Sequence, residues 1–129
     1  MNIDLSGKTA LITASTAGIG FAIAKALADS GALVIINGRS VASVAGAKER
    51  LSDALPNVEI HGVAADLGDA AGVQRLIDTV SSQNIDILIN NAGIFGQKDF
   101  FETGDDTWEQ YWQTNVMSGV RLSRSLTGC

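Results

Sequence analysis

Cysteine is almost absent from this chain. The only one is Cys129, so no disulfide can form within the 129 residues. A chain without internal disulfides is typical of a reducing compartment, and we expect a cytoplasmic location. No apolar run approaches the roughly 20 residues needed to cross a bilayer, so we expect no membrane-spanning segment. The first residues also lack the basic stretch and apolar core of a signal peptide.

Basic residues and metal ligands are also scarce. The chain has 9 Lys and Arg against 14 Asp and Glu, a net charge of −5, and no block of like charge. Nucleic-acid backbones need clustered Lys and Arg, so we expect no nucleic-acid partner. His61 is the only histidine, and no Cys, Asp or Glu is spaced with it as a set of metal ligands. We therefore expect no metal site.

What is present is the composition of a folded domain. Apolar residues make up 46% of the chain and charged residues 18%, values far from those of disordered segments. A chain of this length forms one domain at most and buries roughly two-thirds of its unfolded surface. No internal repeat, linker or low-complexity segment interrupts it. We therefore treat residues 1–129 as a single domain.

Predicted strands and helices alternate along the chain. Short apolar runs predict buried strands at residues 9–13, 33–37, 58–63 and 85–89. Helical spacing and end signals predict helices at residues 18–30, 40–55, 69–80 and 106–126. Ser40 and Asp69 are candidate caps for the second and third of these helices.

This order predicts a doubly wound, parallel α/β sheet of about four strands. Strands without polar alternation are buried on both faces, and strands separated by helices pair in parallel through right-handed crossovers. The expected fold is thus Rossmann-like, with helices on both faces. Ligands of such sheets bind at the carboxyl ends of the strands, beside the point where the strand order reverses.

A glycine-rich turn lies at the first of these strand ends. The run from Thr13 to Gly20 joins an apolar strand to a helix and contains Gly18 and Gly20. Glycines let backbone approach a phosphate closely, and the helix N-terminus directs free N–H groups and positive potential at it. This pattern predicts a dinucleotide site. The alternative is an ordinary strand–turn–helix connection.

Three further segments carry a family resemblance. Asn90-Asn91-Ala92-Gly93 follows the fourth strand, Asp66-Leu67 follows the third, and Asn115 lies on the last helix. Together with the glycine turn they make the chain similar to the short-chain dehydrogenase/reductase family, from Leu5 to about Arg124. The resemblance implies an oxidoreductase that moves a hydride between a nicotinamide cofactor and a small carbonyl or alcohol substrate. It also implies a catalytic role for Asn115 and contact between Asp66 and adenine.

The resemblance implies cofactor-binding residues at all four strand ends. They are Ala14, Ser15, Thr16, Gly18, Ile19, Gly20, Asn37, Arg39, Ser40, Asp66, Leu67, Asn90, Ala92 and Gly93. Simpler alternatives stay open for several of them. Asp66 could cap a turn, Asn90 and Asn91 could brace strand ends, and Asn115 could be a solvated helix residue. Ala14 stands where the family has glycine, which should be tolerated if its φ is negative.

The choice between NADP(H) and NAD(H) depends on the end of the second strand. NAD enzymes of this kind place an acidic residue there to bind the ribose hydroxyls. Residues 36–40 contain no carboxylate, whereas Arg39 can pair with a 2′-phosphate through charge-assisted hydrogen bonds. We therefore favour NADP(H). The alternative is that Arg39 is a surface residue in a turn.

The proton-transfer residues of the family have no match in this chain. The family uses a tyrosine whose pKa is lowered by a lysine four residues later, and a serine that orients the substrate. Tyr111 is the only tyrosine, and Asn115 follows it at that distance. We interpret the chain as the cofactor-binding half of a longer enzyme, truncated before the Tyr-x-x-x-Lys region and inactive alone. The alternative is a non-catalytic nucleotide-binding module or sensor.

A missing fifth strand would leave the fourth one exposed. Residues 85–89 would then form an apolar sheet edge, which promotes self-association. In the family, the last helix also often lies at a subunit interface. We therefore expect a homo-oligomer, formed through that edge or that helix, or poor solubility.

Overall fold

The structure, a computed structural model, describes residues 4–91 and 104–126. The strands are β1 (Thr9–Ile12), β2 (Leu33–Gly38), β3 (Ile60–Ala64) and β4 (Ile87–Ile89). The helices between them are α1 (Gly18–Asp29), α2 (Val41–Ala54) and α3 (Ala70–Val80). The predicted alternation is confirmed, with strand limits that differ by one or two residues.

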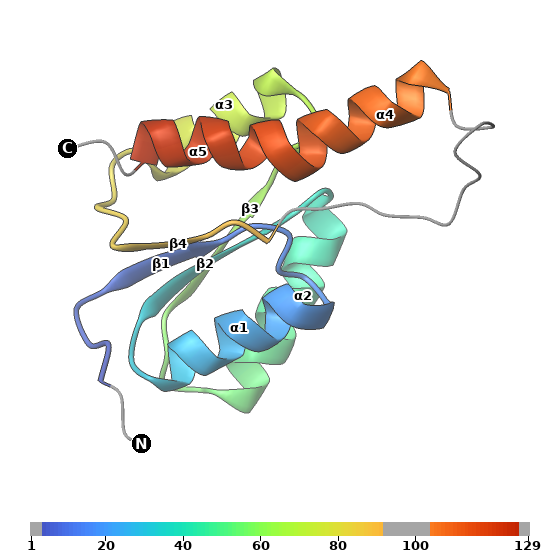
Figure 1. The fold of residues 1–129 in the computed structure, drawn as a ribbon. Helices are drawn as coiled ribbons and strands as arrows, with labels where there is room; N and C mark the ends of the chain where they lie inside the picture. Colours follow the sequence, from blue (N-terminus) through green and yellow to red (C-terminus); the bar gives the residue numbers. More distant parts are fainter. Residues whose placement is uncertain (1–3, 92–103, 127–129) are drawn as a thin grey trace.

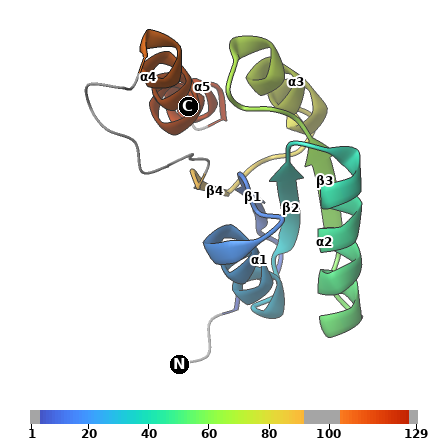
Figure 2. The same ribbon diagram turned by 90° about the vertical axis from the view of Figure 1, so that its right-hand side faces the viewer.

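The strands form one parallel sheet in the order β3-β2-β1-β4. The chain moves outward from β1 to β2 and β3, and then returns to the other side of β1 for β4 (Figure 2). The strand order therefore reverses beside β1, between β1 and β4. In open α/β sheets this reversal, at the carboxyl ends of the strands, is where ligands bind.

Helices cover both faces of the sheet, as predicted. Helices α1 and α2 lie on one face, and α3 lies with α5 (Ser118–Leu126) on the other (Figure 1). Successive residues of β1 point to opposite faces, so Ala10 and Ile12 pack in the cluster with α1 and α2, whereas Leu11 packs in the cluster with α3 and α5. The fold is thus a doubly wound sheet with an apolar layer on each side.

The predicted caps are present at two helices. The Ser40 Oγ accepts a hydrogen bond from the Ser43 N–H at 3.1 Å, and the Asp69 Oδ1 accepts one from the Gly72 N–H at 2.7 Å. Each satisfies an N–H group that has no partner within the helix. These local signals explain why α2 and α3 begin where they do.

The last predicted helix is confirmed as a continuous helical run, but its middle differs. It comprises α4 (Asp105–Tyr111), the π-helical segment η1 (Trp112–Met117) and α5. A π turn holds one more residue than an α turn, and the spacing of apolar residues did not reveal it.

Among the described residues, no helix is both long and apolar enough to span a bilayer.

Candidate functional site

The glycine-rich turn brings the start of α1 against the ends of β1 and β4. Gly18 has a φ of +63°, in the left-handed region that favours glycine. At Gly20, a Cβ would lie 2.6 Å from the Ala14 carbonyl oxygen and 2.5 Å from the Asn91 Nδ2, so no side chain fits there. This close approach places the first turn of α1 at the reversal of strand order.

The N-terminus of α1 is open to an anion. No side chain caps it at Ala17, Gly18 is exposed, and the Ile19 side chain is 75% exposed. The first N–H groups of a helix have no carbonyl partner within the helix, and here they lie on an exposed segment. Such a segment can bind a phosphate through its N–H groups and the positive end of the helix dipole.

Ala14 does not have the negative φ on which its tolerance depended. Its φ is +50°, so the condition under which alanine should be tolerated there is not met. The left-handed region costs a residue with a Cβ about 1–2 kcal/mol, because the Cβ crowds the following carbonyl. Ala14 is held there from both sides: its N–H donates to the Asn37 Oδ1 at 3.0 Å, and its carbonyl accepts from the Asn91 Nδ2 at 3.1 Å.

Asn37 and Ser15 form a buried network behind the turn. Asn37 is 2% exposed, and its Nδ2 donates to the carbonyls of Val63 and Ala65 at 3.1 and 3.3 Å. The Ser15 Oγ donates to the Ile12 carbonyl at 2.8 Å and accepts from the Asn37 N–H at 3.0 Å. Both residues were predicted to touch a cofactor. Their side chains point inward and tie the turn to β2 and β3.

Arg39 and Asp66 meet at the ends of β2 and β3. The Arg39 Nη2 lies 3.7 Å from the Asp66 Oδ2, and the two side chains are 73% and 52% exposed. An ion pair this open to water contributes little to stability, so an anionic ligand can compete for Arg39. The Asp66 Oδ1 also accepts from the Gly68 N–H at 2.8 Å, so Asp66 does cap a turn.

Ser40 and Leu67 were also predicted to contact the cofactor, and their side chains stabilise the fold. Ser40 caps α2 through the hydrogen bond described above. Leu67 is 4% exposed and packs in the apolar layer beneath α3. A ligand at this rim therefore meets Leu67 through its backbone rather than its side chain.

The residues after β4 brace the strand ends. The Asn91 N–H donates to the Thr13 Oγ1 at 2.9 Å, which joins β4 to the glycine turn together with the Ala14 bond. Asn90 is exposed, and its Nδ2 donates to the Ser123 Oγ of α5 at 3.1 Å. Ala92 and Gly93 lie outside the described residues. Asn115 lies in η1, and its side chain is outside the described part of the structure.

Arg50 of α2 contacts the turn and was not predicted. Its Nη2 donates to the Thr16 carbonyl at 2.6 Å, and its guanidinium carbon lies 4.7 Å from the centre of the Phe21 ring. The second distance is within the range of a cation–π contact. Arg50 is 34 positions from Thr16, and only the packing of α2 beside α1 brings them together. No pattern in the sequence signals this contact.

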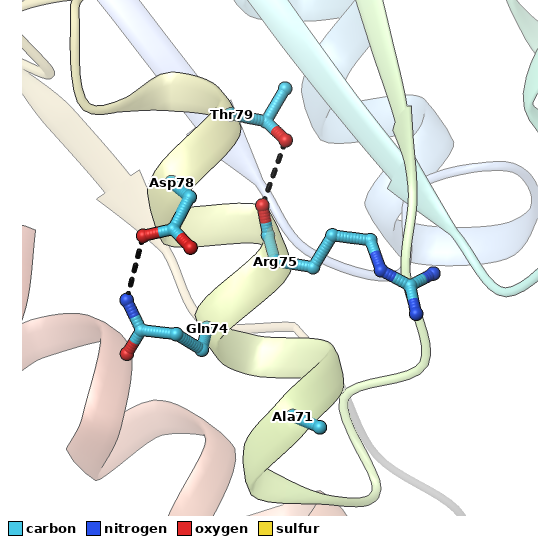
Figure 3. Close-up of a pocket in the computed structure, with 5 residues that line it drawn as sticks. All are labelled: Ala71, Gln74, Arg75, Asp78 and Thr79. Atoms are coloured by element: carbon cyan, nitrogen blue, oxygen red, sulfur yellow. Dashed lines mark hydrogen bonds between the residues drawn. The ribbon is translucent and has the colours of Figure 1, made fainter.

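Helix α3 carries a shallow depression whose side chains form hydrogen bonds within that same helix. Figure 3 shows the five residues that line it: Ala71, Gln74, Arg75, Asp78 and Thr79. Gln74 donates to Asp78 at 2.8 Å, and the Thr79 hydroxyl donates to the Arg75 carbonyl at 2.7 Å, one turn back in the same helix. These contacts are typical of a solvated helix surface.

Among the described residues, no group of His, Cys, Asp or Glu is arranged to hold a metal ion.

Comparison with known proteins identifies the family to which this architecture belongs. The family model described as short chain dehydrogenase matches residues 8–128. Among curated proteins, the uncharacterized oxidoreductases YvaG and YvrD of Bacillus subtilis are 44% identical over 124 residues and 45% identical over 125 residues. Each alignment covers 96% of this chain and 46% of the relative. The chain thus spans about half the length of the curated relatives it matches.

Solved structures show the same relationship. The crystal structure of L-sorbose reductase from Gluconobacter frateurii, complexed with NADPH and L-sorbose, matches with a TM-score of 0.91 and 37% identity. The match covers 98% of this chain and 49% of the reductase chain. The fold of this chain is therefore shared with about half of an oxidoreductase chain of known structure.

Proposed function

Since this chain belongs to the short chain dehydrogenase family, we propose that it forms the NADP(H)-binding part of an oxidoreductase. The observation that carries the proposal is the uncapped, exposed N-terminus of α1, placed beside β1 where the strand order reverses. Its residues fit a diphosphate, because Gly18 leaves the exposed backbone bare and Gly20 lets the turn close against Ala14. When bound, the nicotinamide supplies or accepts a hydride, and the substrate is a small carbonyl or alcohol.

The proposed site combines residues from the ends of all four strands. Thr16, Gly18, Ile19 and Gly20 offer backbone N–H groups to the diphosphate, and Asp66 with Leu67 binds the adenine. Arg39 and Ser40 lie where a ribose phosphate would bind. We assign Asn90, Ala92 and Gly93 to cofactor binding by their match to the family, and Asn115 to the support of proton transfer.

We propose NADP(H) rather than NAD(H) because of the charge at the end of β2. Arg39 is exposed there, and residues 36–40 include no carboxylate. The Asp66 carboxylate is the partner that a 2′-phosphate must displace from Arg39. The guanidinium can then make two parallel charge-assisted hydrogen bonds to the phosphate. The L-sorbose reductase match, a complex with NADPH, supports this preference.

We also propose that this stretch binds cofactor without completing the reaction. The 129 residues contain Tyr111 as the only tyrosine, with Asn115 rather than lysine four positions later. A free tyrosine titrates near pH 10, so proton transfer near neutrality needs an adjacent cation to lower its pKa. The same observation favours the second candidate, a nucleotide-binding module without catalysis. These two candidates are distinguished by assaying hydride transfer to a panel of ketones with the longer protein to which this chain is proposed to belong.

The cofactor proposal is tested by titrating the protein with NADPH and NADH, followed by coenzyme fluorescence. Arg39→Ala should weaken NADPH binding roughly 10- to 100-fold, because it removes charge-assisted hydrogen bonds, and should change NADH binding little. The matched control is Arg75→Ala, which removes an exposed arginine of α3. Equal losses for both coenzymes would contradict the role of Arg39. A correctly folded protein that binds neither coenzyme would contradict the proposed function.

A further inference from the structure

We propose that Asn37 is a positioning residue, which holds Ala14 in its left-handed conformation and thereby sets the backbone path of the glycine-rich turn. The inference rests on the proposed function, because it concerns the site that would bind the diphosphate. It assigns Asn37 an action through Ala14 rather than direct contact with the cofactor.

The Asn37 side chain has only one suitable orientation. Its Nδ2 donates to two carbonyls of the β3 end, those of Val63 and Ala65. Rotating the amide by 180° would bring the Oδ1 against these two carbonyl oxygens, which cannot donate. The Oδ1 therefore faces the turn, where it accepts from the Ala14 N–H at 3.0 Å.

The hydrogen bond between Ala14 and Asn37 is shielded from water on the Asn37 side. Asn37 is 2% exposed, and its backbone is also tied to Ser15, whose N–H donates to the Asn37 carbonyl at 2.8 Å. The bond itself is partly buried, so water replaces a lost acceptor only in part, and an Ala14 N–H without one is disfavoured. The Ala14 N–H therefore stays directed at Asn37, and this direction limits the conformations open to Ala14.

The conformation of Ala14 sets the position of the peptide beneath the start of α1. Its φ of +50° is readily adopted by glycine but not by alanine, so neighbours must impose it. Its carbonyl oxygen would lie 2.6 Å from a Cβ at Gly20, so the Ala14 peptide packs directly under the first turn of α1. If Ala14 relaxed to a negative φ, this peptide would rotate, and the N–H groups proposed to bind the diphosphate would move with it.

We therefore expect the effects of substitutions at positions 14 and 37 to be coupled. With alanine at position 14, losing Asn37 frees the turn to relax. With glycine there, the left-handed conformation is intrinsically accessible and Asn37 matters less for the turn. The bonds from Asn37 to the Val63 and Ala65 carbonyls are lost in either background.

The test is a double-mutant cycle of Ala14→Gly, Asn37→Ala and the combined variant, with the NADPH dissociation constant and the urea midpoint measured for each. We expect Asn37→Ala to weaken NADPH binding about tenfold, and the combined variant to return to within about threefold of the wild type. The urea midpoint should stay low in the combined variant, because the β3 bonds are still missing. Asn57→Ala, at an exposed position at the opposite end of the sheet, is the control and should change neither quantity.

A purely structural role predicts something else. Asn37→Ala would then weaken binding by the same factor with alanine or glycine at position 14, and that result would overturn the inference. Amide hydrogen exchange of the wild type provides a second measurement if Asn37→Ala does not fold. We expect the Ala14 amide to exchange far more slowly than the exposed Ile19 amide, and equal rates would overturn the inference. This readout needs no coenzyme, so failure of the proposed function is distinguished from failure of the inference.

Discussion

At the scale of single residues, Ala14 shows how the turn keeps a glycine-like geometry without the glycine. Its φ of +50° costs an alanine about 1–2 kcal/mol relative to an unstrained conformation. Hydrogen bonds with Asn37 of β2 and with Asn91, two residues after β4, offset that cost by holding the N–H and the carbonyl of Ala14. The conformation is thus decided by residues far away in the sequence.

Replacing Ala14 by glycine should therefore stabilise the protein. We expect Ala14→Gly to raise the free energy of unfolding by about 0.5–1 kcal/mol, because the relief of strain exceeds the added entropy of the unfolded chain. Urea denaturation measures this change. Ala45→Gly, at an exposed position inside α2, is the matched control and should lower the free energy of unfolding by about 1 kcal/mol. A decrease for both variants would show that Ala14 is not strained.

At the scale of elements, α2 supports the turn as well as covering the sheet. Arg50 joins α2 to the Thr16 carbonyl and lies over the Phe21 ring of α1. One side chain thus connects two helices and the loop that precedes α1. Because the guanidinium is already bound to a carbonyl, we expect it to steady the loop rather than to distinguish one coenzyme from another.

Arg50→Ala should weaken NADPH and NADH binding by the same factor, roughly two- to tenfold, which is the value of one net hydrogen bond. The dissociation constants of both coenzymes, measured by fluorescence titration, test this. Lys48→Ala removes an exposed cation from the same helix and should leave both constants unchanged. A selective loss of NADPH binding would instead make Arg50 a phosphate ligand.

At the scale of the whole molecule, the two edges of the described sheet differ in character. The β3 edge contains His61 and Gly62, which discourage pairing with another strand. The β4 edge reads Ile-Leu-Ile and is only partly buried. Since β4 pairs with β1 on one side alone within the described residues, its other side offers backbone groups to a partner.

We therefore expect this protein to self-associate through the β4 edge or through the helical run that ends in α5. Light scattering over a range of protein concentrations should show a mass at least twice that of the single chain, or aggregation as the concentration rises. The lowest concentration in the series is the internal control, because association depends on mass action. A monodisperse monomer throughout the range would contradict the prediction.

Much of the fold and part of the site could be predicted from the sequence. Strand positions, helix caps at Ser40 and Asp69, and the convergence of four strand ends follow from local patterns, and the structure confirms them. Side-chain directions at the site could not be predicted in the same way. Asn37 points inward and Arg39 outward although they are two positions apart, because a buried amide finds partners on β3 whereas the guanidinium remains in water.

The sequence by itself determined the order of the elements, the parallel sheet and the strand ends that meet at the candidate site, since these depend on local periodicity, turn residues and the handedness of crossovers. Only the tertiary structure decided how the turn is held. Asn37, Arg50 and Asn91 come from separate parts of the chain, and packing alone brings them into hydrogen-bonding distance of the turn. The backbone angle of Ala14 is the clearest case, because a left-handed alanine is intrinsically unfavourable and occurs only where its surroundings impose it.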